Sequence, residues 1–532
     1  LPDSLRALGA YSFTGAGLES ITIPNKLKAL RERTFASCPN LKTVVLGDSL
    51  ESIVADYSAT FYETPNITTV KFGKGMKEIN NAFGGQANLT TVILGDSIKV
   101  IGNSAFNGCA ALNSINIPNT ARTIGDYAFA GCAALTNITL PDSLQTLGGY
   151  AFSGAGLTNI TIPNKLKELR ERTFASCPNL TTVVLGDSLK TIAADYSGAF
   201  YETPNITSVT FGNGIEEINH AFSGQQKLTK VILGKKVKTI GNSAFNGCAA
   251  LASFNFPETI TQLGSSAFSN TALRTLTLPS KLTQIPEMAF YNCDSLRSII
   301  LGKQITQIAN NAFGECDSIR EVTVDNTIPE IINIASSFAN MRKISFGVSV
   351  TEIPDNLLSN KSKLQEIVLG ENVTKIGRSA FSSTALRSFT FPAKVTTIGE
   401  EVFNTCTQLK KVKFNTVLTE IPANTFNNCT ALDSIGLPNS IRKIGARAFN
   451  GCDSLRKVLL NAELTEISAY AFYNAGKKKL ESITIPANVK SIGEYAFAGC
   501  DTLSTIVLGA AIDSIAGYAF QNCRNLKTIT LP

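Results

Sequence analysis

The sequence predicts a repeat solenoid: a right-handed stack of about 23 rungs, each of about 22–23 residues, with short parallel strands, tight turns and little regular helix. Two observations lead to this prediction. A phenylalanine recurs along the whole chain at a nearly fixed interval, and one long block of sequence occurs twice. One rung cannot bury its own apolar side, so regular repeats indicate one continuous array over residues 1–532.

The repeated phrase is Ala-Phe, three residues to Cys, three to Leu, three to Ile or Val, two to Leu or Ile, then Pro or Gly. One copy runs from Ala105 and Phe106 through Cys109 to Pro118. The anchoring aromatic extends from Phe13 to Phe520, with Leu358 in its place once. Most intervals between anchors match that from Phe106 to Phe129 to within one residue. This regularity argues against a string of separate globular domains.

A group of rungs is itself repeated in the sequence. Residues 1–139 and 140–278 align without a gap, which indicates that a block of six rungs was duplicated. Residues 279–532 supply further rungs, with an irregular stretch near 325–364.

Each rung can be interpreted from its pattern. In one copy, Ile115 and Ile117 are expected to point inward and Asn116 outward, as in a short strand. A second extended segment is expected over 121–124. Gly125 then interrupts the chain, and residues 126–129 are expected to form a tight turn.

Composition excludes several classes of protein. The chain is 44% hydrophobic and 17% charged, too apolar for a disordered protein. Its net charge of +7 is small for 532 residues, and no basic cluster is interleaved with aromatics, so no nucleic-acid partner is expected. No run of about 18 apolar residues occurs, so no transmembrane segment is expected in this chain. Both ends fall inside a repeat, as in a trimmed piece of a longer chain.

All twelve cysteines share one repeat position, three residues after the anchoring Phe. We expect buried small hydrophobic side chains in a column. Disulfides between adjacent rungs, for example Cys109 with Cys132 or Cys500 with Cys523, are the alternative. Cys38, Cys177 and Cys248 have no cysteine on a neighbouring rung, which disfavours it. Zinc is less expected still, because the chain has no C-x-x-C and one histidine.

The sequence offers no catalytic centre and no cofactor site. The single histidine, His220, corresponds to Asn81 in the first block, so that position tolerates a side chain that does not titrate. No phosphate-binding or dinucleotide motif is present. Adjacent carboxylates such as Glu216 and Glu217 should point in opposite directions. We therefore expect no enzyme, no metal and no cofactor.

The repeat resembles the BspA-like, or Treponema-type, class of leucine-rich repeats over the whole chain. The segment that bears the resemblance contains Ile138-Thr139-Leu140-Pro141, Leu144, Leu147-Gly148 and Ala151-Phe152. The resemblance implies a leucine-rich-repeat solenoid. It also implies a secreted or cell-surface protein associated with adhesion to host proteins or other cells. It carries over no defined ligand site.

One set of candidate binding residues is the outward column of the strands. It is Thr or Asn in most rungs that end in Pro, and aliphatic in many that end in Gly, including Val45, Ile93, Val184 and Ile232. Strand propensity alone explains these residues. A neutral amphipathic face for an elongated ligand is the functional alternative.

Two insertions provide the second set. The longest intervals run from Phe35 to Phe61 and from Phe174 to Phe200. These regions hold Tyr57 and Tyr62 in the first block and Tyr196 and Tyr201 in the second. Tyrosine is favoured in recognition because it joins a large apolar body to a polar tip. The two loops lie six rungs apart, roughly 29 Å at the strand spacing, which suits a bivalent ligand. A loop packed on itself is the simpler interpretation.

The third candidate is a basic tip at Lys477, Lys478 and Lys479. It is expected to be a solvated loop, or a contact for an anionic partner such as a sulfated glycan. Taken together, the sequence predicts a non-catalytic binding or adhesion scaffold at the cell surface or outside the cell. Its partner would be an extracellular-matrix or cell-surface protein or glycan. A structural spacer or a self-assembling surface-layer subunit is the alternative.

Overall fold

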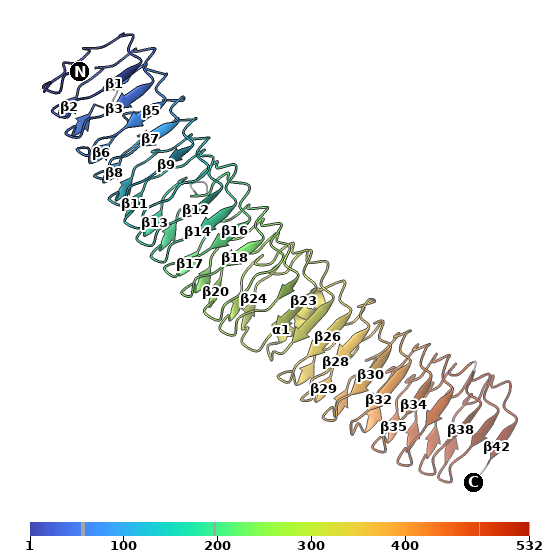
Figure 1. Cartoon of the computed structure of the whole chain (residues 1–532). Helices are drawn as coiled ribbons and strands as arrows, with labels where there is room; N and C mark the ends of the chain where they lie inside the picture. The colour runs from blue at the N-terminus through green and yellow to red at the C-terminus, as the bar shows by residue number, and fades with distance from the viewer. Residues whose placement is uncertain (55–58, 195–197, 478, 531–532) are drawn as a thin grey trace. The chain divides into compact units, whose positions relative to one another are not determined.

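The computed structural model describes residues 1–54, 59–194, 198–477 and 479–530. It is a parallel β-solenoid of about 22 turns with almost no helix, as the sequence predicted (Figure 1). The described chain divides into two compact units: unit 1 contains residues 1–295 and 309–315, and unit 2 contains residues 296–308 and 316–532. One continuous array over the whole chain remains a prediction.

Most turns contribute one strand to each of two sheet layers. The first-layer strands of unit 1 are β1 (Ser20–Thr22), β3 (Thr43–Val45), β5 (Thr69–Lys71), β7 (Thr91–Ile93), β9 (Ser114–Ile115), β12 (Asn159–Thr161), β14 (Thr182–Val184), β16 (Ser208–Thr210), β18 (Lys230–Ile232) and β21 (Thr275–Leu276). Its second-layer strands are shorter: β2 (Ala29–Leu30), β4 (Ser52–Ile53), β6 (Glu78–Ile79), β8 (Val100–Ile101), β10 (Thr123–Ile124), β11 (Thr146–Leu147), β13 (Glu168–Leu169), β15 (Thr191–Ile192), β17 (Glu217–Ile218), β19 (Thr239–Ile240), β20 (Gln262–Leu263) and β22 (Gln284–Ile285).

Unit 2 repeats this arrangement. Its first-layer strands are β23 (Ser298–Leu301), β25 (Glu321–Val324), β26 (Lys343–Phe346), β28 (Glu366–Val368), β30 (Ser388–Phe391), β32 (Lys411–Phe414), β34 (Ser434–Gly436), β36 (Lys457–Leu459), β38 (Ser482–Thr484), β40 (Thr505–Val507) and β42 (Thr528–Thr530). Its second-layer strands are β24 (Gln307–Ile308), β27 (Glu352–Ile353), β29 (Lys375–Ile376), β31 (Thr397–Ile398), β33 (Glu420–Ile421), β35 (Lys443–Ile444), β37 (Glu466–Ile467), β39 (Ser491–Ile492) and β41 (Ser514–Ile515).

Neighbouring rungs pair in parallel and in register. In unit 1 the first-layer order includes β1-β3-β5-β7-β9, with Ile21 opposite Val44. In unit 2 the second-layer order includes β33-β35-β37-β39-β41, with Ile444 opposite Ile467. Equivalent side chains therefore stand above one another at the strand spacing of about 4.7–4.9 Å.

The rung from 114 to 129 shows where the sequence interpretation held. Ile115 and Ile117 are buried and Asn116 is exposed, as predicted. The strands are shorter than expected, because β9 ends at Ile115 and β10 covers Thr123–Ile124 alone.

The turn of this rung depends on two different backbone effects. Tyr127, and not Gly125, has a positive φ, of 58°. Gly125 is required for space, since a Cβ there would lie 2.6 Å from the backbone nitrogen of Asn103 in the rung before. Glycine thus permits close stacking of rungs and does not break the chain.

The core is a ladder of stacked phenylalanine rings. In unit 1, the centroids of Phe106 and Phe129 are 5.5 Å apart with a 16° interplanar angle. In unit 2, those of Phe403 and Phe426 are 5.4 Å apart at 1°. Each of these rings is fully buried, which stabilises the fold by about 1.5–3 kcal/mol per side chain.

The cysteines form the buried column that their shared position predicted. All twelve are free thiols, eleven of them buried and Cys523 half-buried. The Cys109 thiol donates to the carbonyl of Phe83 at 3.3 Å, the anchoring residue of the rung before. Where Thr takes this position, Thr64 makes the same bond to the Phe35 carbonyl at 2.7 Å. The structure therefore assigns the column a hydrogen-bonding role as well as a packing role.

The irregular stretch predicted near 325–364 holds a short helix, α1 (Pro329–Ile334), followed by a turn of 3-10 helix, η2 (Ala335–Ser337). Ile331 and Ile332 of α1 are buried. Among the described residues, no helix is long and apolar enough to cross a membrane.

Candidate functional site

The aliphatic column on the outer face of the first layer is interrupted. In unit 1, Ile93 and Ile232 are 49% and 44% exposed, whereas Val45 and Val184 are half-buried. Lys71 pairs between Val45 and Ile93, and Thr210 pairs between Val184 and Ile232. Polar side chains therefore separate the aliphatic ones, and these four do not form a continuous apolar row.

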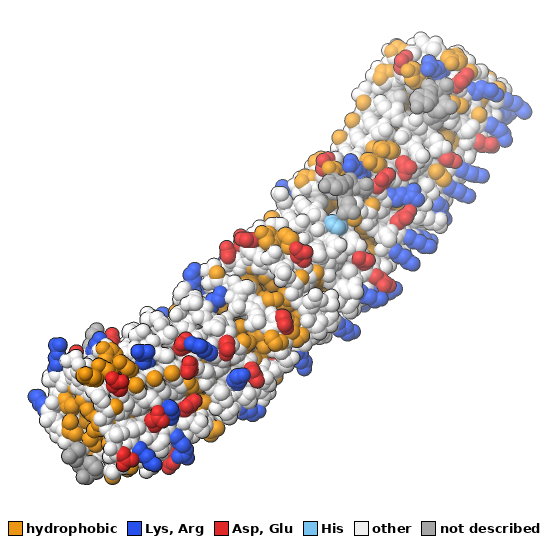
Figure 2. All heavy atoms as spheres, turned by 180° about the vertical axis from the view of Figure 1, so that it is seen from behind, with side chains coloured by type: hydrophobic (Ala, Val, Ile, Leu, Met, Phe, Trp, Pro, Cys, Tyr) orange, Lys and Arg blue, Asp and Glu red, His pale blue; other side chains and the backbone are white. Residues whose placement is uncertain are grey.

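Unit 2 adds exposed aliphatic residues to the equivalent column. They are Ile300, Val368, Leu459 and Val507. Leu459 was missed in the sequence because its rung ends in Leu460-Asn461 and not in Gly. The alignment with Gly436 across β34 and β36 would have identified it. Hydrophobic side chains occur as separate patches among charges of both signs on the face shown in Figure 2.

The two insertions place equivalent tyrosines beside arginines. The guanidinium of Arg33 lies 4.3 Å from the centroid of the Tyr62 ring, and that of Arg172 lies 4.4 Å from the Tyr201 ring. Such cation–π contacts contribute about 0.5–1 kcal/mol at exposed sites and fix the ring in place. Tyr57 and Tyr196 lie outside the described residues.

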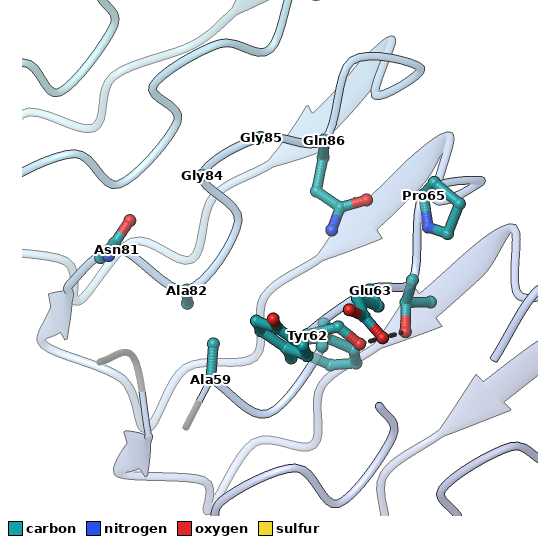
Figure 3. A pocket seen from close by; sticks show the side chains of 11 residues that line it. Ala59, Tyr62, Glu63, Pro65, Asn81, Ala82, Gly84, Gly85 and Gln86 are labelled. Atoms are coloured by element: carbon teal, nitrogen blue, oxygen red, sulfur yellow. Dashed lines mark hydrogen bonds between the residues drawn. The ribbon is translucent and has the colours of Figure 1, made fainter. Parts of the chain in front are cut away.

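A pocket opens beside each of these tyrosines, and we call them the tyrosine pockets. The first has a volume of about 620 Å³ and is drawn in Figure 3. It is lined by Ala59, Phe61, Tyr62, Glu63, Thr64, Pro65, Asn81, Ala82, Gly84, Gly85 and Gln86. The second, of about 600 Å³, is lined by Gly198, Phe200, Tyr201, Glu202, Thr203, Pro204, His220, Ala221, Ser223, Gly224, Gln225, Ser243 and Asn246. The duplication has therefore reproduced a whole site and not only two residues.

The least expected residue of each pocket is a buried glutamine. Gln86 and Gln225 are each 5% exposed, and the Oε1 atom of each has no hydrogen-bond partner among the described residues. In Figure 3 the Gln86 carboxamide extends toward Tyr62 and Glu63. A buried polar group without a partner lowers the free energy of unfolding by about 1–3 kcal/mol. A ligand that donates a hydrogen bond to the glutamine oxygen would remove this penalty.

Sequence reasoning missed these glutamines although a signal was present. Both follow the anchoring Phe by three residues, the position that Cys holds in most rungs. A long polar side chain at this position does not improve packing in the core, so its presence indicates a role in binding.

The acidic residue of each pocket is held in a defined position. The Ser37 hydroxyl donates to Glu63 at 3.2 Å, and the Ser176 hydroxyl donates to Glu202 at 3.3 Å. Glu63 has a φ of 52° and Glu202 a φ of 51°, so both residues have the same left-handed backbone conformation in their turns. The pocket can thus offer a ligand an aromatic ring, a carboxylate and a carboxamide.

The Glu216 carboxylate does not have the electrostatics of a general acid. A hydrogen bond and the charge of Lys238, at 3.0 Å, lower the pKa of Glu216. A general acid would need a raised pKa. The described residues contain no group of three His, Cys, Asp or Glu side chains that could hold a metal ion.

At the basic tip, Lys477 and Lys479 are exposed, and Lys478 lies outside the described residues. Lys479 and the aliphatic Leu459 line one cavity of about 690 Å³, so a lysine of the predicted basic tip lies beside an aliphatic residue that was not predicted. The nearby carboxylate of Asp433 is held by Arg456 at 2.6 Å, which lowers its pKa.

Comparison with known proteins identifies the repeat. Six copies of the BspA type leucine rich repeat region match residues 1–113, 99–222, 218–341, 283–410, 335–435 and 419–532. No curated protein matches the chain.

Solved structures of bacterial repeat proteins are similar at low identity. A leucine-rich repeat protein from Bacteroides ovatus is 22% identical, with a TM-score of 0.33; the alignment covers 82% of this chain and 86% of that one. A leucine rich cell surface protein from Faecalibacterium prausnitzii is 23% identical, with a TM-score of 0.29; the alignment covers 66% and 83% of the two chains.

Proposed function

The chain belongs to the family of BspA-type leucine-rich-repeat proteins, and we propose that it is a non-catalytic adhesion scaffold, secreted or held at the cell surface. Repeats of this family form scaffolds for protein binding. The partner we propose is a macromolecule of a host or of a neighbouring cell.

One observation carries the proposal: the candidate recognition features occur twice at the same interval. Tyr62 and Tyr201, Gln86 and Gln225, and Ile93 and Ile232 are each separated by the length of the duplicated block. Each lies in unit 1, so the two tyrosine pockets stand six rungs apart, roughly 29 Å along the stack. A surface that presents one pocket twice suits a partner that is long or repetitive.

The chemistry of the pockets also favours recognition over catalysis. Each combines a ring fixed by an arginine with a buried amide oxygen that lacks a partner among the described residues, the type of group that gives a binding site its specificity. Phe61 and Phe200, which also line the pockets, are part of the buried ladder, so the pockets are built on the rigid core of the stack.

The test is solid-phase binding of the purified chain to extracellular-matrix proteins, at low and high salt. We expect saturable binding that survives high salt, because the pockets act through shape and hydrogen bonds. Replacing both tyrosines, by Tyr62→Ala with Tyr201→Ala, should weaken it at least tenfold. Tyr11→Ala is the matched control, since Tyr11 is exposed and lines neither pocket.

A second variant separates loss of the site from loss of the fold. Gln86→Cys with Gln225→Cys restores the residue found at this position in most rungs, so it should keep or raise the melting temperature while weakening binding. No binding to any protein on the panel would contradict the proposal. Sedimentation would then show whether the chain associates with itself, as a spacer or surface-layer subunit would.

A further inference from the structure

A row of cations runs along unit 1, where seven of the twelve second-layer strands follow a Lys or Arg. The other five strands follow Glu51, Gln145, Glu216, Thr261 and Thr283. The members of the row are exposed and are Lys28, Lys77, Lys99, Arg122, Lys167, Lys190 and Lys238. We call this set the basic row. It shares no residue with the tyrosine pockets.

The stacking of rungs brings these cations together. The backbone nitrogen of Lys99 donates to the Lys77 carbonyl at 2.7 Å, and that of Arg122 donates to the Lys99 carbonyl at 2.8 Å. Lys190 bonds in the same way to Lys167 at 2.8 Å. Lys77, Lys99 and Arg122 therefore occupy successive rungs, about 4.7–4.9 Å apart, and so do Lys167 and Lys190. A line of Lys and Arg side chains is visible along this edge in the upper right of Figure 2.

The fold does not require a cation at this position. In unit 2 the equivalent residue is most often threonine: Thr306, Thr351, Thr374, Thr396, Thr419 and Thr465, against Arg442, Lys490 and Asp513. Threonine also adds a bond that lysine cannot form, since the Thr374 hydroxyl donates to the Thr351 carbonyl at 3.2 Å and that of Thr465 to the Arg442 carbonyl at 2.9 Å. Seven rungs of unit 1 carry a positive charge at this position, where a threonine could form such a bond.

Two carboxylates at equivalent positions, Glu51 and Glu216, neutralise part of the row. Glu51 pairs with Lys28 at 3.2 Å, and Glu216 pairs with Lys238 at 3.0 Å. Among the described residues, Lys77, Lys99, Lys167 and Lys190 form no ion pair within 4.0 Å, and the Arg122 guanidinium donates to the carbonyls of Asn119 and Thr120. Glu78 and Glu168 follow their cations in sequence, and Glu168 pairs with Arg170 at 2.9 Å.

Adjacent cations at this spacing repel one another, and their fields add because they lie well within a Debye length of about 8–10 Å. Threonine would serve the fold at these positions without this repulsion. An anionic partner would offset the repulsion, which gives a reason for the cations. The partner must be linear, because the charges follow one line up the stack.

We propose that the basic row binds a linear sulfated polysaccharide along unit 1. The sulfate groups meet successive cations, and the polymer runs parallel to the stacking direction. Single-stranded nucleic acid fits less well, because such sites interleave cations with stacking aromatics. The residues that follow the cations are Ala29, Glu78, Val100, Thr123, Glu168, Thr191 and Thr239.

The test uses heparin as the probe and threonine as the substitute, because unit 2 carries threonine at this position. In the row variant, Lys77→Thr, Lys99→Thr and Arg122→Thr are combined. We expect it to elute from immobilised heparin at lower salt than the unchanged chain. The slope of log K against log salt concentration should fall by about three, one for each cation removed.

The control variant removes the same charge elsewhere, by Lys410→Thr, Lys411→Thr and Lys413→Thr on exposed positions of unit 2. It should bind heparin as the unchanged chain does. Circular dichroism and melting temperature establish that both variants are folded. Chemically desulfated heparin should not bind.

Three results would overturn the proposal: an equal loss in the row and control variants, no loss in the row variant, or binding of single-stranded DNA as tight as that of heparin. None of them affects the tyrosine pockets. Conversely, loss of matrix-protein binding at high salt would contradict the adhesion proposal and leave the row intact.

Discussion

At the scale of single residues, the position three residues after the anchoring Phe is occupied most often by a side chain that can donate a hydrogen bond. Cys132 donates to the Phe carbonyl of the preceding rung at 3.3 Å, and Thr203 does so at 2.7 Å. Thr384 donates instead to the Phe381 carbonyl of its own rung at 2.9 Å. The thiol is ionisable and threonine is not, so the choice between them makes stability depend on pH.

Burial raises the pKa of the Cys132 thiol from 9.0 to about 12. The same cause raises the pKa of Cys177 and Cys248 to about 12. The folded state therefore holds these protons more tightly than the unfolded chain does. The stability contributed by the neutral thiols is complete below pH 9 and is lost as the pH rises from 9 toward 12.

We expect Cys132→Thr to reduce this loss. Threonine keeps the hydrogen bond and has no proton to lose in this range, so the free energy of unfolding should fall less between pH 9 and pH 11 than in the unchanged chain. Urea unfolding across that range is the measurement. An identical pH dependence in both chains would show that ionisation of Cys132 does not contribute.

At the scale of the rung, the sequence predicted the parts that repeat. The spacing of Phe and the alternation at Ile115 and Ile117 indicated the core and the inward direction correctly. Strand bounds were less accurate, because β10 depends on pairing with β8 and β11 and not on residues 121–124 alone. The role of Gly125 was misread for a similar reason, since its contact lies on Asn103 in the preceding rung.

Gly125→Ala should therefore destabilise unit 1 by about 1–3 kcal/mol, because the added Cβ meets backbone of the neighbouring rung that cannot move freely. Gly17→Ala is the control, since its Cβ would meet nothing nearer than the Asn40 amide at 3.9 Å. Thermal unfolding of both variants gives the comparison. Equal melting temperatures would mean that the rungs can separate to admit a methyl group.

Phe129 offers a test of how far a defect spreads. Phe129→Ala should cost about 3–5 kcal/mol, and Phe129→Leu should cost less, since Leu358 already replaces Phe in one rung. Each rung contacts only its neighbours, so we expect faster amide hydrogen exchange in the adjoining strands β8, β10 and β11 and unchanged exchange near Phe449. Faster exchange throughout the chain would contradict this locality.

At the scale of the whole molecule, the sequence predicted a binding scaffold but missed what stacking brings together. Lys77, Lys99 and Arg122 are each one rung apart in the sequence, so a search for contiguous basic clusters found only Lys477–Lys479. Arg33 and Tyr62 are separated by more than one ordinary rung because an insertion lengthens that interval. Residues that lie one rung length apart in the sequence become neighbours in the stack. A search for residues adjacent in the sequence does not find such contacts.

The duplication also predicts how affinity should depend on the number of pockets. Two equivalent sites on one rigid unit gain from avidity toward a repetitive ligand. Gln86→Leu alone should leave one pocket and lower the apparent affinity for such a ligand far more than for a monovalent fragment. Surface plasmon resonance with both forms measures this. A proportional loss for the two forms would show that the pockets act independently.

The in-register pairing of rungs has a consequence for how the gene can change. Within unit 1, position in the sequence maps linearly onto distance, so gain or loss of the codons for one rung between the two pockets would move them by one strand spacing, about 4.8 Å. Recombination between similar segments would therefore change the span of the ligand in fixed steps and leave the chemistry of each pocket untouched. Selection for ligands of different length would then act on the length of the gene and would need no new contact residues.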